Sequence, residues 1–403
     1  MARQLNEVEK LIDELCPEGV EFKELGEVTA WDKKFNGIDR KKQKKVINYP
    51  YVLANRFKEI VQTTGNVRLL STGNYVGWTT EKLAGENLCE GEIVAIPWGG
   101  RANIKYYKGK FVTADNRIAT SLDTNILLNK FIFYWLLVNN RLLESFYRGS
   151  GIKHPNMKKV LGMNIPIPPL PIQKEIVKIL DNFAELEAEL EAELEARKKQ
   201  YEHYREELLT FGDDIGWIPL GELGNVSMCK RIFKNQTSSS GEIPFFTIGT
   251  FGKQPKSFIP AKIYNEYKTK YSFPKKGDIL LSASGTIGRL VIYDGEPAYF
   301  QDSNIIWLKN DESKVLNKFL YYFYAITKWE TEGGTIKRLY NRNFNKIKIP
   351  TPDLEEQERI VKTLDKFDAL VNDILIGLPA ELKARRQQYE YYRERLLTFK
   401  EKK

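Results

Sequence analysis

The chain has 403 residues, of which 42% are hydrophobic and 29% charged, and its formal net charge at pH 7 is +9. This length indicates two or three domains, and the hydrophobic content excludes wholesale disorder. Its two histidines and three widely spaced cysteines argue against a histidine-based metal site, a zinc finger and a disulfide framework.

The first 16 residues, MARQLNEVEKLIDELC, are charged and amphipathic. This pattern predicts an N-terminal helix and differs from a secretory signal, which needs an apolar central region. No apolar run in the chain approaches the ~18 residues of a membrane span. We therefore expect a cytoplasmic protein with no membrane partner.

Residues 17–164 form the first of two dissimilar basic blocks, with 23 Lys and Arg against 14 Asp and Glu. Its segment 91–122 has the pattern of a strand, a glycine-containing turn that carries an arginine, a second strand, and an Asp/Asn turn before a third strand. The aromatic run 131–147 follows and predicts a helix. The block is expected to be an α+β domain.

Residues 165–211 begin with a proline-rich boundary and then repeat apolar side chains in steps of four and three, or of seven. This is the seam of a coiled coil. A helix over residues 173–211 would be about 58 Å long at 1.5 Å per residue. A helix of that length could hold the two basic blocks apart, and adding one LEAE unit would then change their spacing.

Residues 212–348 form the second basic block, which has 20 Lys and Arg against 13 Asp and Glu from residue 213 onward. Its segment 277–308 repeats the pattern of strand, glycine turn, strand, polar turn and strand, and its run 318–330 predicts another aromatic helix. A second α+β domain is expected.

Residues 349–403 repeat the first constant region. Eleven of 19 positions in 349–367 are identical to 165–183, and 13 of 18 in 382–399 are identical to 194–211. The chain is therefore a pseudo-two-fold tandem repeat. Gly377-Leu378-Pro379 should interrupt or kink the second long helix. If the two seams pack on each other with a domain at either end, the helices must run antiparallel.

Net positive charge is confined to the two blocks, which carry +9 and +7. The rest of the chain has 19 basic and 26 acidic residues and is therefore net negative. A lysine-rich genome could explain the net value but not this partition. The partition favours a polyanion partner that is contacted at two places.

Polar side chains in the loops of both blocks are candidate DNA contacts, because Arg, Asn, Gln, Ser and Thr can bond to base edges and Lys can bind phosphates. Roles as turn or capping residues, or as parts of solvated basic loops, are the alternatives. The candidates in the first block are Lys33, Lys34, Arg40, Lys44, Arg101, Asn103, Asn116, Arg117 and Lys153. Those in the second block are Ser284, Thr286, Arg289, Gln301, Ser303, Asn304, Lys337, Arg338 and Arg342.

Catalytic motifs are missing from the sequence. It has no phosphate-binding loop of the G-x-x-x-x-G-K-[ST] type, no Asn/Asp-Pro-Pro-aromatic string of the amino-methyltransferases and no convincing nuclease pattern. The chain is expected to be non-catalytic, with no metal site and no cofactor of its own.

The repeated IPxPxLxxQxxIVKxLDxF and A-R-x-x-Q-Y-x-x-Y-R-x-x-L-L-T-F motifs resemble the specificity subunits of type I restriction-modification enzymes, as do the GDILLSxSGTIGR and YFQDSN strings. The resemblance covers essentially the whole chain. It implies two target recognition domains that each read one half of a split, asymmetric double-stranded DNA site. It divides the chain into an N-terminal helix (1–16), a first recognition domain (17–164), a central conserved helix (165–211), a second recognition domain (212–348) and a C-terminal conserved helix (349–403).

The resemblance also implies partner proteins. The helices would dock methyltransferase (M) subunits, two of them, and restriction (R) subunits would join through these. S-adenosylmethionine, ATP and Mg would then belong to the partners. Two other hypotheses are a stand-alone tandem DNA-binding regulator, which would act without a methyltransferase, and a coiled-coil adaptor, which would show no salt-dependent DNA binding.

Overall fold

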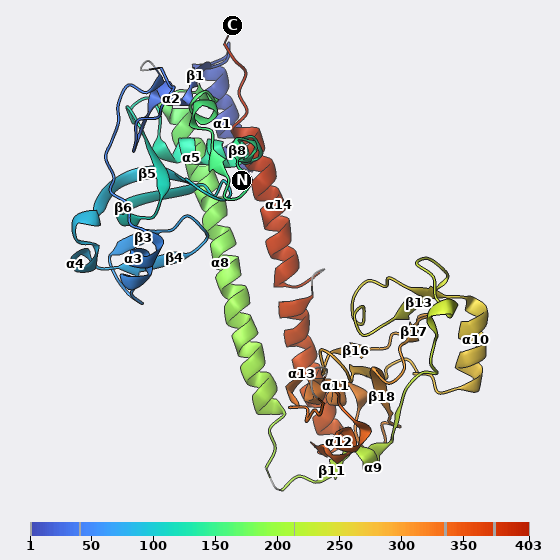
Figure 1. Ribbon diagram of the computed structural model, residues 1–403. Coiled ribbons are helices and arrows are strands. Elements are labelled where there is room, and N and C mark those ends of the chain that lie inside the picture. Colours follow the sequence, from blue (N-terminus) through green and yellow to red (C-terminus); the bar gives the residue numbers. More distant parts are fainter. Residues whose placement is uncertain (1, 40–41, 213, 334–336, 374–375, 403) are drawn as a thin grey trace. The chain divides into compact units, whose positions relative to one another are not determined.

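The computed structural model describes residues 2–39, 42–212, 214–333, 337–373 and 376–402 (Figure 1). By its internal contacts the chain divides into two units, residues 1–190 with 382–403 (unit 1) and residues 191–381 (unit 2). The long helix α8, Leu170–Leu208, contributes to both units. Each unit combines helices with β-sheet, as the sequence predicts.

Unit 1 is built on a six-stranded sheet in which β3 and β6 are parallel and the other neighbours are antiparallel. The strands β5, β6 and β7 are the three that the sequence predicts in residues 91–122. In sheet order, the strands are β2 (Thr29–Trp31), β7 (Asn116–Ser121), β5 (Cys89–Pro97), β6 (Lys105–Thr113), β3 (Val67–Leu70) and β4 (Val76–Thr79).

The aromatic run after β7 forms two helices, α5 (Asn129–Val138) and α6 (Asn140–Ser145), where the sequence predicts one. Asn139 separates them, and its side-chain amide donates to the carbonyl of Trp135 at 2.9 Å, a local bond that competes with helix continuation. Helix α5 packs on β5 with its apolar side chains buried. The remaining short helices of unit 1 are α1 (Ala2–Leu15), α2 (Leu25–Val28), α3 (Ala54–Glu59), α4 (Glu81–Ala84), η2 (Gly85–Asn87) and α7 (Met157–Leu161).

Unit 2 contains a four-stranded antiparallel sheet and a three-stranded sheet. The first has the order β12 (Asn225–Ser227), β18 (Ile305–Lys309), β15 (Ile279–Ser282) and β16 (Leu290–Ile292). The second has the order β14 (Phe258–Ile259), β13 (Ile243–Phe246) and β17 (Tyr299–Phe300). The helices are α9 (Leu220–Leu223), η3 (Lys234–Gln236), α10 (Ala261–Lys270), α11 (Asn317–Ile326), α12 (Asn341–Lys346) and α13 (Leu354–Asn372).

A pair of short strands closes each basic block. In unit 1, β1 (Glu21–Glu24) enters the block and pairs antiparallel with β10 (Asn164–Ile167), which leaves it. In unit 2, β11 (Trp217–Pro219) pairs with β19 (Lys348–Pro350) in the same way. Ile165 and Ile349, the equivalent residues of the two closing strands, are both fully buried. Because each closing strand is followed within a few residues by a long helix, the closure places the start of that helix next to its block.

The first part of α8 packs in unit 1 against α14 (Leu378–Leu396). The ring of Phe183 lies 5.9 Å from that of Tyr389 and 5.5 Å from that of Tyr392. Glu187, which interrupts the apolar stripe, accepts from Arg386 at 2.6 Å. Because residue numbers rise along one helix as they fall along the other, the two helices are antiparallel, as predicted.

The same packing occurs in unit 2 between the last part of α8 and α13. The ring of Phe367, the counterpart of Phe183, lies 6.3 Å from that of Tyr201 and 5.3 Å from that of Tyr204. The second constant region is divided, because α13 ends at Asn372 and α14 begins at Leu378. The interruption predicted from the Gly-Leu-Pro segment is therefore confirmed.

Candidate nucleic-acid interface

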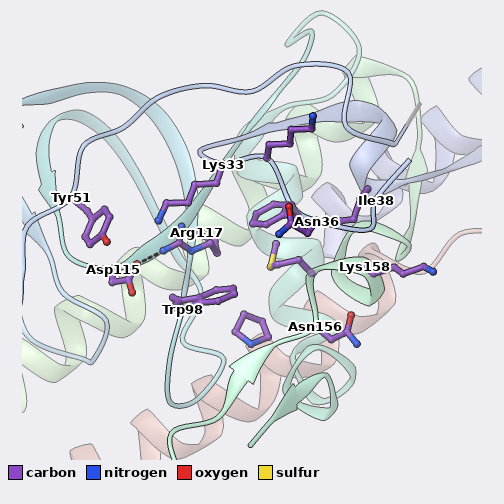
Figure 2. Close-up of a pocket in the computed structure, with 13 residues that line it drawn as sticks. Lys33, Asn36, Ile38, Tyr51, Trp98, Asp115, Arg117, Asn156 and Lys158 are labelled. Carbon is purple, nitrogen blue, oxygen red and sulfur yellow. Dashed lines mark hydrogen bonds and ion pairs between the residues drawn. The ribbon is translucent and has the colours of Figure 1, made fainter. Parts of the chain in front are cut away.

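A surface hollow of about 500 Å³ in unit 1 gathers several predicted DNA contacts (Figure 2). It lies where the loop after β2, the end of β5, the turn before β7 and the start of α7 meet. We call it the first hollow. Its lining residues are Lys33, Lys34, Phe35, Asn36, Ile38, Tyr51, Trp98, Asp115, Arg117, Pro155, Asn156, Met157 and Lys158.

Arg117 forms the floor of the first hollow and is almost fully buried, with a side chain 2% exposed. It donates to Asp32 at 3.0 Å. It also donates to Asp115, and its guanidinium lies 4.9 Å from the ring centre of Trp98 (Figure 2). The second oxygen of Asp32 accepts the backbone N–H of Ile118 at 3.0 Å. Burial raises the pKa of Asp32, and the nearby Arg117 opposes that rise. In this conformation Arg117 positions Trp98 and Asp115.

The exposed cations of the first hollow are Lys33, Lys34 and Lys158. The Nζ of Lys33 lies 4.6 Å from the ring centre of Tyr51, within the range of a cation–π contact. Lysine side chains at the rim of a hollow suit phosphate oxygens, because an ammonium acts as a point charge with three donors.

The loop 149–153 lies against the end of β5. Gly100 donates its N–H to the carbonyl of Lys153 at 2.9 Å. His154 places Nδ1 2.7 Å from the carbonyl of Trp98, and the two rings lie 5.2 Å apart. These contacts bring the exposed Lys153 and Arg101 to the side of the first hollow.

Two predicted asparagines already have structural partners. Asn103 donates to the carbonyl of Gly73 at 2.9 Å and to Asn74 at 3.0 Å. Asn116 is 2% exposed and donates to the carbonyl of Leu70 at 2.9 Å. Both side chains brace the loop between β3 and β4, and a base contact by either stays a prediction.

The two remaining candidates of the first block lie elsewhere. Lys44 is exposed at a separate hollow beside Lys23, Glu27 and Asp123. Arg40 lies outside the described residues.

A hollow of about 630 Å³ in unit 2, the second hollow, is formed by the residues after β12 and β15, the turn before β18 and the start of α12. Leu339 donates its N–H to the carbonyl of Ala283 at 2.9 Å, and Arg338 bonds through its backbone to Glu332 at 2.8 and 3.0 Å. Its lining residues are Met228, Ala283, Ser303, Glu332, Arg338, Leu339, Tyr340, Asn341 and Arg342.

The two hollows occupy corresponding places in the repeat. In unit 1 the residues that bound the hollow follow β2 and β5 and precede β7, which pairs with both strands. In unit 2 they follow β12 and β15 and precede β18, which again pairs with both. Each hollow also reaches the start of a short helix. Residues 155–158 of the first hollow match 339–342 of the second at the same offset that relates Ile165 to Ile349. Their side chains differ, so the hollows correspond in position and are unlike in chemistry.

Charge in the second hollow is arranged around Glu332. It accepts from Arg342 and, at 2.9 Å, from Asn343, and these bonds hold the pKa of Glu332 below its usual value. The guanidinium of Arg342 also lies 5.6 Å from the ring centre of Tyr340. Arg338 is exposed at the same edge, and an exposed guanidinium can bond to guanine or to a phosphate.

The other predicted residues of the second block surround the hollow or brace its walls. Arg289 donates to the carbonyl of Phe251 at 2.8 Å, and Gln301 accepts the N–H of Ile248 at 2.9 Å. Both therefore fix the loop after β13. Ser303 lines the hollow with a φ of +53°. The rest are Ser284, which is buried and bridged to Arg338, Asn304, whose carbonyl accepts the N–H of Ala283, and the exposed Thr286 and Lys337.

Sequence reasoning missed the glutamine that attaches each block to its long helix. In unit 1 the side chain of Gln173 is fully buried. Its Oε1 accepts the N–H of Leu128 at 2.9 Å, and its Nε2 donates to the carbonyls of Ile126 and Pro168, both at 2.7 Å. Two of the bonds satisfy backbone groups just before α5, and the third satisfies the carbonyl of Pro168 just before α8.

Gln357 makes the same three bonds in unit 2. Its Oε1 accepts the N–H of Leu316 at 2.8 Å, and its Nε2 donates to the carbonyls of Lys314 and Pro352 at 2.9 and 2.8 Å. The signal was present in the sequence, since this glutamine is one of the identities between the two constant regions. We call the two arrangements the glutamine clamps.

An aspartate eight residues, or about two turns, further along each long helix adds a second attachment in each unit. Asp181 accepts from Lys130 at 2.8 Å and from the hydroxyl of Tyr134 at 2.5 Å. Asp365 accepts in the same way from Lys318 at 2.7 Å and from the hydroxyl of Tyr322 at 2.5 Å. Burial and the adjacent carboxylate raise the pKa of both tyrosines, so each hydroxyl remains a donor.

Two repeated α+β units, each carrying a polar hollow and joined to a long helix, define a protein with paired recognition domains on a helical scaffold. The family model for the type I restriction modification DNA specificity domain matches residues 17–196 and again residues 213–384. The chain belongs to this family.

Relatives named as type I specificity subunits share most of the chain. A Haemophilus influenzae type I restriction enzyme specificity subunit is 52% identical over 77% of this chain and 83% of its own. The Escherichia coli EcoR124I/EcoR124II specificity subunit is 30% identical over 70% of this chain and 74% of its own.

Solved structures share the fold. The S subunit of a type I restriction-modification system from M. genitalium superposes with a TM-score of 0.58 at 16% identity, covering 94% of this chain and 96% of that chain. A chain from a study of complex assembly in the type I R-M system gives a TM-score of 0.53 at 16% identity, covering 95% and 98%. Among the described residues, no helix is both long and apolar enough to cross a membrane.

Proposed function

We propose that this chain is the DNA sequence-specificity subunit of a type I restriction-modification complex and reads a split, asymmetric site in double-stranded DNA. The observation that carries the proposal is the pair of hollows, equivalent in position and unlike in chemistry. Equivalent placement gives both units the same approach to DNA. Unlike side chains give the two half-sites different sequences.

Each hollow offers chemistry suited to one half-site. The first presents lysines around the buried Arg117 and the half-buried Trp98, and the second presents Arg338 and Arg342 beside Ser303. Arginine and serine can bond to base edges, and lysine contacts phosphates. The predicted DNA-binding residues that line neither hollow, such as Thr286 and Lys337, would contact the flanking backbone.

The proposal assigns the chemical steps to partners. Methyltransferase subunits, two per chain, would dock on the long helices, and restriction subunits would join through them. S-adenosylmethionine, ATP and Mg would be bound by those partners, and this chain would supply sequence recognition and scaffolding in the cytoplasm. Among the described residues no cluster of three or more His, Cys, Asp or Glu side chains is arranged to hold a metal ion.

The test is to express the chain with its neighbouring methyltransferase in a host without DNA methylation and to map modified adenines across the genome. The expected result is one split motif with a fixed gap. Replacing residues 213–348 by the block of a relative should change one half of the motif and leave the other intact. A contiguous motif, or a change in both halves, would contradict the assignment of one half-site to each unit.

Arginine variants connect the two hollows to the two halves. Arg338→Gln should relax or weaken only the half-site read by unit 2, because a bidentate arginine–guanine contact contributes about 1–3 kcal/mol of discrimination. Arg101→Gln is the matched substitution beside the first hollow and should affect only the other half-site. A stand-alone regulator would instead bind DNA without co-purifying with a methyltransferase.

A further inference from the structure

A third hollow, of about 320 Å³, lies in unit 2 at the opposite end of β15 and β18 from the second hollow. The two strands are antiparallel, so Asp278 before β15 lies beside Lys309 at the end of β18. The second hollow lies at the other ends, at Ala283 and Ser303. Strands of this length, at about 3.4 Å per residue, place the two hollows roughly 15 Å apart.

The wall of the third hollow is cationic. Lys268, Lys275 and Lys309 line it. None of the three forms a close ion pair among the residues that the structure describes, although Asp278 interacts electrostatically with Lys275 and Lys309. The Nζ of Lys268 lies 3.2 Å from the hydroxyl of Tyr264. The one carboxylate in the wall, Asp278, is 7% exposed and accepts the backbone N–H of Lys275 at 2.8 Å. The accessible charge is therefore positive.

The indole N–H of Trp307 is a second, independent feature of the third hollow. It lines the hollow and is 1% exposed. Its indole N–H has no hydrogen-bond acceptor in the described part of the chain. Buried polar groups are normally paired, and an indole nitrogen can only donate. A hydrogen-bond acceptor in the hollow would pair with this N–H, and the three lysines beside it favour an acceptor that carries negative charge.

We propose that the third hollow binds a phosphate group, with Lys309, Lys275 and Lys268 neutralising its charge and the Trp307 N–H donating to one of its oxygens. A phosphate combines several acceptor oxygens with negative charge, which would balance the lysines of this wall. The phosphate would belong to the DNA backbone, an assignment that rests on the proposed function. Its binding would fix the orientation of unit 2 on DNA while the second hollow contacts bases.

The site is particular to unit 2. Trp307 pairs with Ser227 across β18 and β12, and at the equivalent place in unit 1 Ala119 pairs with Trp31. Alanine has no polar side-chain atom, so unit 1 lacks the donor. We therefore expect a backbone contact that flanks only one of the two half-sites.

Two full-length variants and a control test the site. Lys309→Gln removes one charge from the wall, and Trp307→Phe removes the donor while keeping an aromatic ring. Lys262→Gln removes the same charge from an exposed position of α10 outside the hollow. DNA carrying the mapped site is titrated over a range of salt concentrations. In a second arm, thermal midpoints are measured with inorganic phosphate against chloride at equal ionic strength.

For a backbone phosphate, Lys309→Gln should lower the slope of log K against log salt by about 0.9, the value for one contact with duplex DNA. Trp307→Phe should weaken binding roughly tenfold with the slope unchanged, because one charge-assisted hydrogen bond is lost. Lys262→Gln should behave as the wild type. Phosphate should raise the thermal midpoint of the wild type and of Lys262→Gln but not of Lys309→Gln.

If only the phosphate arm responds, the hollow holds a free phosphate compound and the DNA part of the proposal is overturned. If neither arm responds, or if Lys262→Gln matches Lys309→Gln in both, the site itself is overturned. Failure of the wild type to bind the mapped DNA would reject the proposed function, and the phosphate arm would still decide whether the hollow is a site.

Discussion

Replacing Gln173 by leucine tests whether the glutamine clamps attach each block to its helix. Leucine keeps much of the volume but removes three hydrogen bonds, to the N–H of Leu128 and to two carbonyls. At about 1–1.5 kcal/mol for each buried bond lost, local stability should fall by about 3–4 kcal/mol. The cost arises because the three backbone groups stay buried without partners.

The assay is hydrogen exchange of the peptide that contains Leu128, because its N–H loses its acceptor. A loss of this size corresponds to an increase in exchange of roughly 100- to 1000-fold. Gln357→Leu should have the same effect on the peptide containing Leu316. Each variant should leave the other unit's peptide unchanged, and the exposed Gln387→Leu should leave both unchanged.

The reasoning would be refuted if Gln173→Leu changed exchange at Leu128 by less than about tenfold, which corresponds to about 1.4 kcal/mol. It would also be refuted if each variant altered both units equally, because the bonds of each clamp lie within one unit.

Other variants probe the buried charges and the break in the second helix. Arg117→Met should destabilise unit 1 by about 3–5 kcal/mol in urea unfolding, because Asp32 would stay buried without its guanidinium, whereas Arg101→Met at the surface should change little. Burial lowers the pKa of Lys105 from 10.5 to about 8; since the folded state then holds fewer protons than the unfolded state between these values, Lys105 makes stability rise with pH across that window. Lys105→Met should abolish this contribution when urea midpoints of the two proteins are compared at pH 8 and pH 10. Gly377→Ala should lower the thermal midpoint, since a Cβ there would lie 2.4 Å from the carbonyl oxygen of Ala369, and a midpoint equal to that of the wild type would show that the turn can relax.

The long helices and the central strands could be predicted from the sequence because their signals are local. Heptad spacing indicated α8, and a glycine two residues before a proline indicated the interruption before α14. The three-strand pattern of residues 91–122 corresponds to β5, β6 and β7. The break between α5 and α6 was not predicted, because it depends on one side-chain bond of Asn139.

The candidate site was only partly accessible to sequence reasoning. Lys33, Ser303 and Arg338 line the hollows, and glycine-rich polar loops were sufficient to suggest them. The burial of Arg117 depends on Asp32, which lies 85 residues away in the chain. No local pattern contains such a pairing, so the sequence could not distinguish an arginine that contacts solvent from one that supports a floor.

The aromatic contacts between the long helices join different copies of the repeat. Phe183 belongs to the first copy and Tyr389 to the second, while Phe367 and Tyr201 make the reciprocal contact. A mutation in one copy therefore alters a contact with the other copy. This limits how far the sequences of the two copies can diverge. Genetic exchange of a whole basic block leaves every such pair untouched, so new combinations of blocks can be inherited without first repairing the helices that carry them.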